Sequence, residues 1–269
     1  MHLPFRLLVL DSRKSVLIIK QINKFPQNLH LTVSMSNMSY DSGVAGMRAA
    51  YRSRQELFTE SDLVCKEPIG QFKAWFDQAR NDPSVMEANA MCLSTASKDG
   101  IPSARYVLLK GFGPDGFKFF TNYESRKAKE IEENPKAALT FYWEVLRRSV
   151  RVEGNVVRLS VEESDEYFHS RPKASQIGAC ASNQSTPISG REVLTAQEKY
   201  LTTEYSDKEI PRPNWGGYMV IPQSIEFWQG QSDRLHDRIR FRRPQETEKP
   251  DGKLLHEGDN GWVFERLAP

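Results

Sequence analysis

The sequence predicts a mainly β protein, an antiparallel barrel with flanking helices. Between residues 89 and 153, short apolar segments recur at regular spacing, separated by turn residues such as Asp99-Gly100 and Pro114-Asp115-Gly116. Only one short helix interrupts them, whereas a parallel sheet would alternate strands with helices. Neither GxGxxG nor GxxxxGK[ST] occurs, so the sequence supports neither a dinucleotide fingerprint nor a P-loop.

Composition narrows the class of protein. The 269 residues suffice for one large domain or two small ones, and 39% hydrophobic with 27% charged residues is typical of a soluble globular protein. No apolar run approaches the ~20 residues of a membrane span. A net charge of +2 does not indicate a nucleic-acid partner. The odd number of cysteines, without a CxxC pair, argues against a disulfide framework and a zinc site (Cys65, Cys92 and Cys180).

The first 40 residues differ from the rest, because they carry five basic residues and one acid. Such a start is compatible with a transit peptide, but the β-like runs Leu7–Leu10 and Val16–Ile19 are equally compatible with a dispensable extension. We therefore divide the chain into an extension, 1–46, and one domain, 47–269. The expected location is cytoplasmic, or mitochondrial if residues 1–40 act as a transit peptide.

Helical periodicity is expected from Met47 to Ala79. Pro68 opens a helix in which Ile69, Phe72 and Phe76 share one side, so this helix should lie as a lid on the core. After it, apolar and alternating segments predict five strands: Ala90–Ala96, Ser103–Lys110, Phe117–Thr121, Ala137–Trp143 and Ser149–Glu153.

Four more helices are expected. One begins at Ser125 and ends before Pro135, a second covers Val161–His169, and Pro172 starts a third that continues to Ala179. A charged helix, 190–208, follows. The Pro-rich and Gly-rich segment from Pro211 to Gly217 then ends the helical part before the last strands.

Basic residues at helix starts are candidate anion sites. Arg126 and Lys127 lie in the first turn of a helix capped by Ser125 or Glu124, where free N–H groups attract an anion. Plain surface solvation is the alternative there. Arg105 and Lys110, five residues apart on one expected strand, should lie on opposite faces, so one of them should reach inward or toward a ligand.

A second candidate anion site surrounds Pro172. Arg171, Lys173 and Ser175 should meet at a helix N-terminus, with the hydroxyl of Tyr167 close by. An interhelical turn with a capping serine explains the same pattern.

The segment Arg234–Arg238 is the third candidate. On a strand, Arg234, His236 and Arg238 would share one face, placing a titratable imidazole between two cations that suit phosphate or carboxylate. A solvated edge strand is the alternative.

Together these motifs resemble the pyridoxine (pyridoxamine) 5′-phosphate oxidase family, from about Met47 to Pro269. The residues that carry the resemblance are Ser103-Ala104-Arg105, Leu108-Leu109-Lys110-Gly111-Phe112, Phe119-Phe120-Thr121-Asn122, Glu124-Ser125-Arg126-Lys127, Tyr167-Phe168-His169-Ser170-Arg171-Pro172, Ser175-Gln176-Ile177-Gly178-Ala179, Trp215-Gly216-Gly217, Glu226-Phe227-Trp228-Gln229-Gly230, Arg234-Leu235-His236-Asp237-Arg238 and Glu265-Arg266-Leu267-Ala268-Pro269.

The resemblance implies a Greek-key split β-barrel that binds FMN, in a homodimer with FMN at each of two subunit interfaces. It implies oxidation of pyridoxine 5′-phosphate and pyridoxamine 5′-phosphate to pyridoxal 5′-phosphate, in vitamin B6 salvage. Molecular oxygen would accept the electrons, with hydrogen peroxide, and ammonia from the amine, as by-products.

The resemblance also implies site residues. Flavin contacts are expected at Arg105, Tyr106, Val107, Leu108, Phe120, Thr121, Arg126, Lys127, Gln184, Ser185, Trp228 and Arg238. Substrate contacts are expected at Lys110, Tyr167, Arg171, Ser175, Arg234, Leu235 and His236. Arg234 and His236 are the expected catalytic residues, with His236 either taking a proton from the substrate or only hydrogen-bonding it.

Two departures from the family pattern bear on these expectations. Ser149 stands where the family commonly has a glutamine that touches FMN, so flavin binding could be weaker. In Arg52-Ser53-Arg54-Gln55, the spacing of the arginines differs from relatives, so no site is assigned there. A non-catalytic carrier of FMN or pyridoxal phosphate is the alternative function. A protein that only binds flavin would not require the expected substrate contacts, and their presence argues against this alternative: Arg234-Leu235-His236, Tyr167, Arg171 and Ser175.

Overall fold

The computed structural model describes residues 7–10, 17–20 and 57–269. The chain divides into two units, 1–49 and 50–269. In the first unit, β1 (Leu7–Leu10) pairs antiparallel with β2 (Leu17–Lys20), which agrees with the β-like runs in the sequence. The expected domain boundary between residues 46 and 47 and the segment 52–55 lie outside the described residues.

The second unit is built on a ten-stranded sheet in which every pairing is antiparallel, so the predicted antiparallel barrel is confirmed. The strand order is β11-β12-β10-β9-β8-β7-β3-β4, and β6 pairs with both β5 and β9. The strands are β3 (Ala90–Ala96), β4 (Pro102–Leu108), β5 (Gly111–Gly113), β6 (Gly116–Asn122), β7 (Lys136–Trp143), β8 (Arg148–Arg158), β9 (Trp215–Gln229), β10 (Asp237–Arg242), β11 (His256–Glu257) and β12 (Val263–Arg266).

The lid helix α1 (Pro68–Asn81) closes the core as expected, but it begins later than the helical periodicity suggested. Glu67 caps it by accepting hydrogen bonds from the N–H groups of Ile69 and Gly70, at 2.8 and 2.6 Å. Residues 57–67 contain only the short 3-10 turn η2 (Glu60–Asp62). Phe72 is fully buried, with its ring centroid 4.9 to 5.0 Å from three other phenylalanine rings, Phe112, Phe117 and Phe141.

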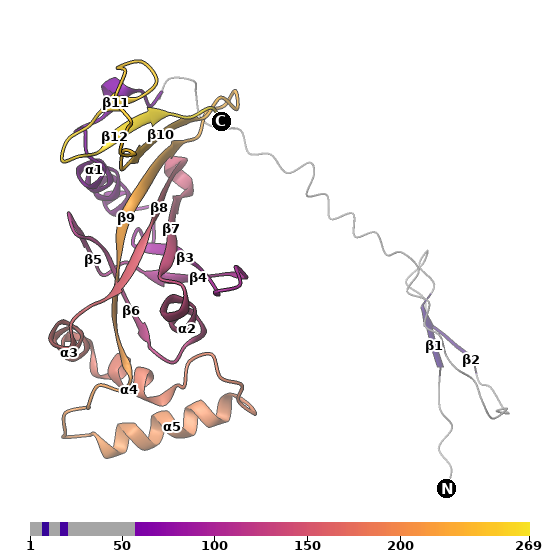
Figure 1. Cartoon of the computed structure of the whole chain (residues 1–269). Helices are drawn as coiled ribbons and strands as arrows, with labels where there is room; N and C mark the ends of the chain where they lie inside the picture. Colours follow the sequence, from indigo (N-terminus) through magenta and orange to yellow (C-terminus); the bar gives the residue numbers. More distant parts are fainter. Residues whose placement is uncertain (1–6, 11–16, 21–56) are drawn as a thin grey trace, which may run out of the picture. The chain divides into compact units, whose positions relative to one another are not determined.

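The remaining helices are α2 (Arg126–Glu133), α3 (Val161–Ser170), α4 (Lys173–Ala181) and α5 (Arg191–Glu204). A second, smaller core holds α3, α4 and α5 against the start of β9; its buried members are Phe168, Ile177, Leu201, Ile210 and Trp215. Figure 1 shows α3, α4 and α5 gathered at one end of β9, with β10 and β12 at its other end. Among the helices that the structure describes, none is long and apolar enough to span a bilayer.

The turn between β5 and β6 depends on Gly116. Its φ is +147°, and a Cβ there would lie 2.3 Å from the carbonyl oxygen of Val220 in β9. Gly113, its partner across the hairpin, has nothing within 4 Å of a Cβ. We expect Gly116→Ala to cost about 3 kcal/mol of folding free energy, because strain and a backbone clash add. Thermal unfolding should then occur roughly 6 to 12 °C lower.

Gly113→Ala is the matched control for this turn and should change the unfolding temperature little. Equal shifts in the two variants would show that the close approach of Gly116 to β9 does not limit stability.

Candidate active site

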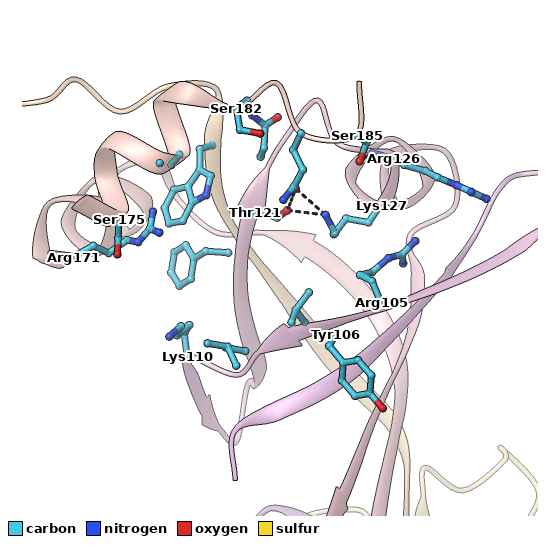
Figure 2. A pocket seen from close by; sticks show the side chains of 18 of the residues that line it. Arg105, Tyr106, Lys110, Thr121, Arg126, Lys127, Arg171, Ser175, Ser182 and Ser185 are labelled. Carbon is cyan, nitrogen blue, oxygen red and sulfur yellow. Dashed lines mark hydrogen bonds between the residues drawn. The ribbon is translucent and has the colours of Figure 1, made fainter. Parts of the chain in front are cut away.

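A cavity of about 1020 Å³ opens among β4, β6, α2, α4 and the first residue of β9. It is lined by Ser103, Ala104, Arg105, Tyr106, Val107, Leu108, Lys110, Phe120, Thr121, Asn122, Arg126, Lys127, Tyr167, Arg171, Pro172, Ser175, Gly178, Ala179, Ser182, Gln184, Ser185 and Trp215. Figure 2 shows its cations in two groups. Arg105, Arg126 and Lys127 lie on one side, and Arg171 lies with Ser175 on the other.

Glu130 organises the first group, the α2 subsite (Arg105, Arg126 and Lys127). Its carboxylate is buried, and it accepts hydrogen bonds from the hydroxyls of Thr95 and Ser103 at 2.5 and 2.6 Å. It also accepts from Arg126 at 2.8 Å and from Arg105 at 3.4 Å. Burial alone would raise the pKa of Glu130, but the hydrogen bonds from Ser103, Thr95 and Arg126 lower it to about 2. An ionised Glu130 therefore holds arginines from β4 and α2 together.

Lys127 is a buried cation at the start of α2. Its ammonium donates to Gln184 Oε1 at 2.8 Å and to Thr121 Oγ1 at 3.2 Å. Burial, and then the charge of Arg105, lower the pKa of Lys127 to about 8, against the opposing effect of Glu130. No carboxylate in the described part of the chain forms an ion pair with it, so its charge is available to an anion in the cavity.

The N-terminus of α2 is completed by residues from a distant loop. Ser125 caps the helix by accepting from the N–H of Ala128 at 3.4 Å, which settles the choice between Ser125 and Glu124. Ser185 accepts from the N–H of Arg126 at 3.2 Å, with a left-handed backbone at φ +74°. Surface solvation, the alternative for this pair of cations, fits the 60% exposed side chain of Arg126 but is wrong for Lys127.

Arg171 dominates the second group, the α4 subsite (Lys110, Arg171 and Ser175). Its Nη1 is buried and has no hydrogen-bond partner, and no carboxylate among the described residues pairs with it. Burial lowers the pKa of Arg171, while Tyr167 opposes the shift. A partly buried cation whose Nη1 has no partner is costly unless a ligand pairs with it, so this position suits an anion. Lys173 does not take part, because its ammonium donates to the carbonyl of Ser206 at 2.6 Å.

The expectation that Arg105 and Lys110 lie on opposite faces of one strand is wrong. Strand β4 ends at Leu108, and the N–H of Lys110 donates to the carbonyl of Lys118 as the chain turns into the β5–β6 hairpin. Because of this break, both cations line the same cavity.

The expected strand across Arg234–Arg238 is also wrong, since β10 begins only at Asp237. Arg234 has a left-handed backbone at φ +68°, so strict alternation of faces does not extend back to it. Arg234 and Leu235 are exposed. His236 accepts a hydrogen bond from the N–H of Gln231 at 2.9 Å, and its ring lies 4.8 Å from that of Trp228.

Five of the expected site residues do not line this cavity: Trp228, Arg234, Leu235, His236 and Arg238. They lie together at the far end of β9, where Trp228 pairs with Arg238, which binds Glu226 at 2.7 Å. Trp215 lines the cavity at the near end of the same 15-residue strand. At ~3.3 Å per residue, the part of β9 between Trp215 and Trp228 is roughly 40 Å long. We call the five residues the β9–β10 corner.

The other expected site residues all line the cavity: Arg105, Tyr106, Val107, Leu108, Lys110, Phe120, Thr121, Arg126, Lys127, Tyr167, Arg171, Ser175, Gln184 and Ser185. No site role was expected for Glu130, Asn122 or Ser182. Asn122 donates to the carbonyl of Ser182 at 3.5 Å and so helps to fix the loop that carries Gln184. One feature of the sequence predicts the ion pair of Glu130 with Arg126: the two residues are four apart on the expected helix.

Ser149, the departure on β8, pairs in register with Trp228, and its hydroxyl donates to the carbonyl of Phe141 at 2.9 Å. Its side chain is therefore engaged within its own sheet, at the corner rather than at the cavity.

Comparisons with known proteins agree on one family. The family model described as pyridoxamine 5′-phosphate oxidase matches residues 79–202, and the model of the pyridoxine 5′-phosphate oxidase C-terminal dimerisation region matches residues 215–269. A pyridoxine/pyridoxamine 5′-phosphate oxidase of Bombyx mori is 60% identical over 236 residues, covering 87% of this chain and 91% of the relative. A pyridoxine-5′-phosphate oxidase of Bos taurus is 57% identical, covering 83% and 86%.

Among solved structures, PhzG from Burkholderia lata 383, in complex with tetrahydrophenazine-1-carboxylic acid, is similar with a TM-score of 0.69 and 30% identity. That match covers 80% of this chain and 98% of PhzG. The matched regions contain the cavity as well as the β9–β10 corner. The chain therefore belongs to the pyridoxine/pyridoxamine 5′-phosphate oxidase family.

Proposed function

We propose that this chain oxidises pyridoxine 5′-phosphate and pyridoxamine 5′-phosphate to pyridoxal 5′-phosphate with FMN as its cofactor. Molecular oxygen takes the electrons and leaves as hydrogen peroxide, with ammonia released from the amine. The observation that carries the proposal is one cavity with two separate anion subsites, because both the cofactor and the substrate bear a phosphate. A cavity with a single subsite would not distinguish this activity from simple flavin binding.

The α2 subsite fits the FMN phosphate. The start of a helix, a buried lysine and two arginines are the groups that bind phosphate in proteins, and Lys127 has no acidic ion-pair partner among the described residues. When bound, FMN supplies the hydride acceptor and passes electrons to oxygen. The chain would contact it through Arg105, Tyr106, Val107, Leu108, Phe120, Thr121, Arg126, Lys127, Gln184 and Ser185.

The α4 subsite fits the phosphate of the vitamer. Arg171 offers a partly buried guanidinium without a carboxylate partner among the described residues, and Ser175 and Lys110 add a hydroxyl and a second cation to the lining of the same cavity. Tyr167 lines this side of the cavity, with its ring centroid 4.0 Å from that of Phe120. An anchored phosphate would orient the pyridine ring so that its C4′ substituent faces the flavin.

We assign the β9–β10 corner to the same site, contributed by a second copy of the chain in a homodimer. Within a single chain, the corner lies at one end of β9 and Trp215, which lines the cavity, lies at the other end. Leu235 is 68% exposed and Arg234 is also exposed, so both are available to a partner. The matched dimerisation region, residues 215–269, includes the whole corner. There Arg234 and His236 would contact the substrate, with His236 taking or sharing the proton of the C4′ substituent, and Trp228 and Arg238 would contact FMN.

The test of this function is a flavin spectrum followed by a peroxide assay. We expect purified protein to carry FMN and to form peroxide in air with pyridoxine 5′-phosphate. Bound flavin without peroxide would favour the carrier instead. A cytoplasmic location, or a mitochondrial one if residues 1–40 act as a transit peptide, stays a prediction.

Lys127 makes FMN binding depend on pH. Its ammonium binds the phosphate only when protonated, and its pKa of about 8 in the free protein means that the charge is lost as the pH rises through that value. Binding of FMN should change little up to about pH 7.5 and should be about tenfold weaker at pH 9, because Lys127 must then take up a proton before it can bind the phosphate. Fluorescence titration of FMN-free protein at both pH values measures this.

Riboflavin, which lacks the phosphate, is the control ligand. Its affinity should not change between the two pH values. An equal decline for both ligands would assign the effect to another group.

A further inference from the structure

The guanidinium of Arg171 lies over the face of the Trp215 ring. The guanidinium carbon of Arg171 lies 4.8 Å from the ring centroid of Trp215. Trp215 is 7% exposed and stacks on Phe120, with centroids 5.3 Å apart and planes 15° apart. Tyr167 is stacked on Phe120 at 4.0 Å, so three aligned rings form one wall of the cavity beneath Arg171.

An aromatic ring can hold a cation in place without neutralising the charge that the cation needs to bind an anion. Arg171 has no carboxylate partner in the described part of the chain, and its Nη1 has no hydrogen bond. A carboxylate would hold the guanidinium but would also cancel its charge. A ring attracts the cation through its quadrupole and leaves the charge and the N–H donors for a ligand.

Two glycines that follow Trp215 fix the position of the backbone from which its ring projects. A Cβ at Gly216 would lie 2.2 Å from the hydroxyl oxygen of Tyr123, and a Cβ at Gly217 would lie 2.4 Å from a methyl of Leu159. Only glycines permit this close packing of the start of β9 against its neighbours. The indole therefore projects from a backbone that has little freedom to shift.

We propose that Trp215 is a positioning residue that holds Arg171 in place for the substrate phosphate, and so sets the affinity for phosphorylated vitamers. The inference rests on the proposed function and adds a residue that acts through Arg171. The α2 subsite, whose arginines are held by Glu130, should be indifferent to Trp215.

The test compares Trp215→Leu with Trp262→Leu. Trp262 is equally buried, at 5% exposed, and carries Arg243 at 4.0 Å, but it does not line the cavity. We expect Trp215→Leu to raise KM for pyridoxine 5′-phosphate about tenfold, with kcat and FMN affinity within about twofold of wild type. Calorimetric titration of FMN-free protein with pyridoxine 5′-phosphate should show the same loss. Trp262→Leu should leave all of these values unchanged.

Trp215→Phe is the conservative variant and keeps a ring under Arg171. It should raise KM only about threefold, and it decides the question if Trp215→Leu does not fold. An unchanged KM in a folded Trp215 variant would overturn the proposal, as would an equal loss of FMN and vitamer affinity. A wild-type protein that binds pyridoxine 5′-phosphate but forms no peroxide would contradict the proposed function alone, because the calorimetric comparison would still test Trp215.

Discussion

Replacing Arg171 with glutamine is expected to raise KM for pyridoxine 5′-phosphate about a hundredfold, which corresponds to about 2.7 kcal/mol of lost binding. The size of this effect follows from the environment of Arg171. Its guanidinium lies on the ring of Trp215 with Nη1 buried, and it has no carboxylate partner among the described residues, so its full charge is available to the phosphate. Affinity for FMN should stay within about twofold, because FMN is assigned to the α2 subsite.

The same substitution should leave the free protein as stable as wild type or slightly more stable. Removing a partly buried cation that has no carboxylate partner among the described residues relieves a desolvation cost, which offsets the lost contact with the ring of Trp215. Steady-state peroxide formation and thermal unfolding, measured on the same preparation, test both expectations together. A residue retained for packing would show the opposite pattern, with stability lost and KM unchanged.

Lys173→Gln is the matched control, because Lys173 is a cation two residues away that points out of the cavity to Ser206. It should change KM by less than about twofold, since long-range attraction from one exposed charge is largely screened. If both variants raised KM equally, the effect would come from the net charge near the cavity. The α4 subsite would then not be assigned to the substrate phosphate.

Local sequence rules predicted the elements whose signals are local. The bounds of β3, the cap at Ser125 and the start of α4 after Pro172 all follow from alternation or capping within a few residues. The cation pair at the start of α2, also a candidate from local signals, lines the cavity. Its two members nevertheless differ, since burial of Lys127 depends on Thr121 and on Gln184, which is 57 residues away in the chain.

The corner at Arg234 could not be predicted because contacts from distant residues shape it. Asp237 accepts hydrogen bonds from the N–H of Phe58 and from Arg266, at 3.0 and 2.8 Å, and so fixes where β10 begins. Residues before Asp237 then form a turn rather than a strand. The break at Leu108, which brings Lys110 into the cavity, has a similar origin in the pairing of Lys110 with Lys118.

In the proposed homodimer, each site would take its cavity from one chain and its β9–β10 corner from the other. Arg171→Gln removes a cation of the α4 subsite in the cavity, and Arg234→Ala removes a cation from the corner. Each variant alone should lose about a hundredfold or more in kcat/KM, the loss expected when a charged group leaves a substrate phosphate or reacting centre. Arg234 is exposed and already left-handed, so alanine, which keeps the Cβ, adds no new backbone strain.

Mixed dimers that carry one variant in each chain test this division directly. If the two residues come from different chains, one of the two sites in a mixed dimer contains both substitutions and the other contains neither. We therefore expect heterodimers, isolated through two different affinity tags, to recover about half of the wild-type kcat/KM for pyridoxine 5′-phosphate. Heterodimers no more active than the average of the two parent variants would contradict the account, because every site would then draw Arg171 and Arg234 from the same chain.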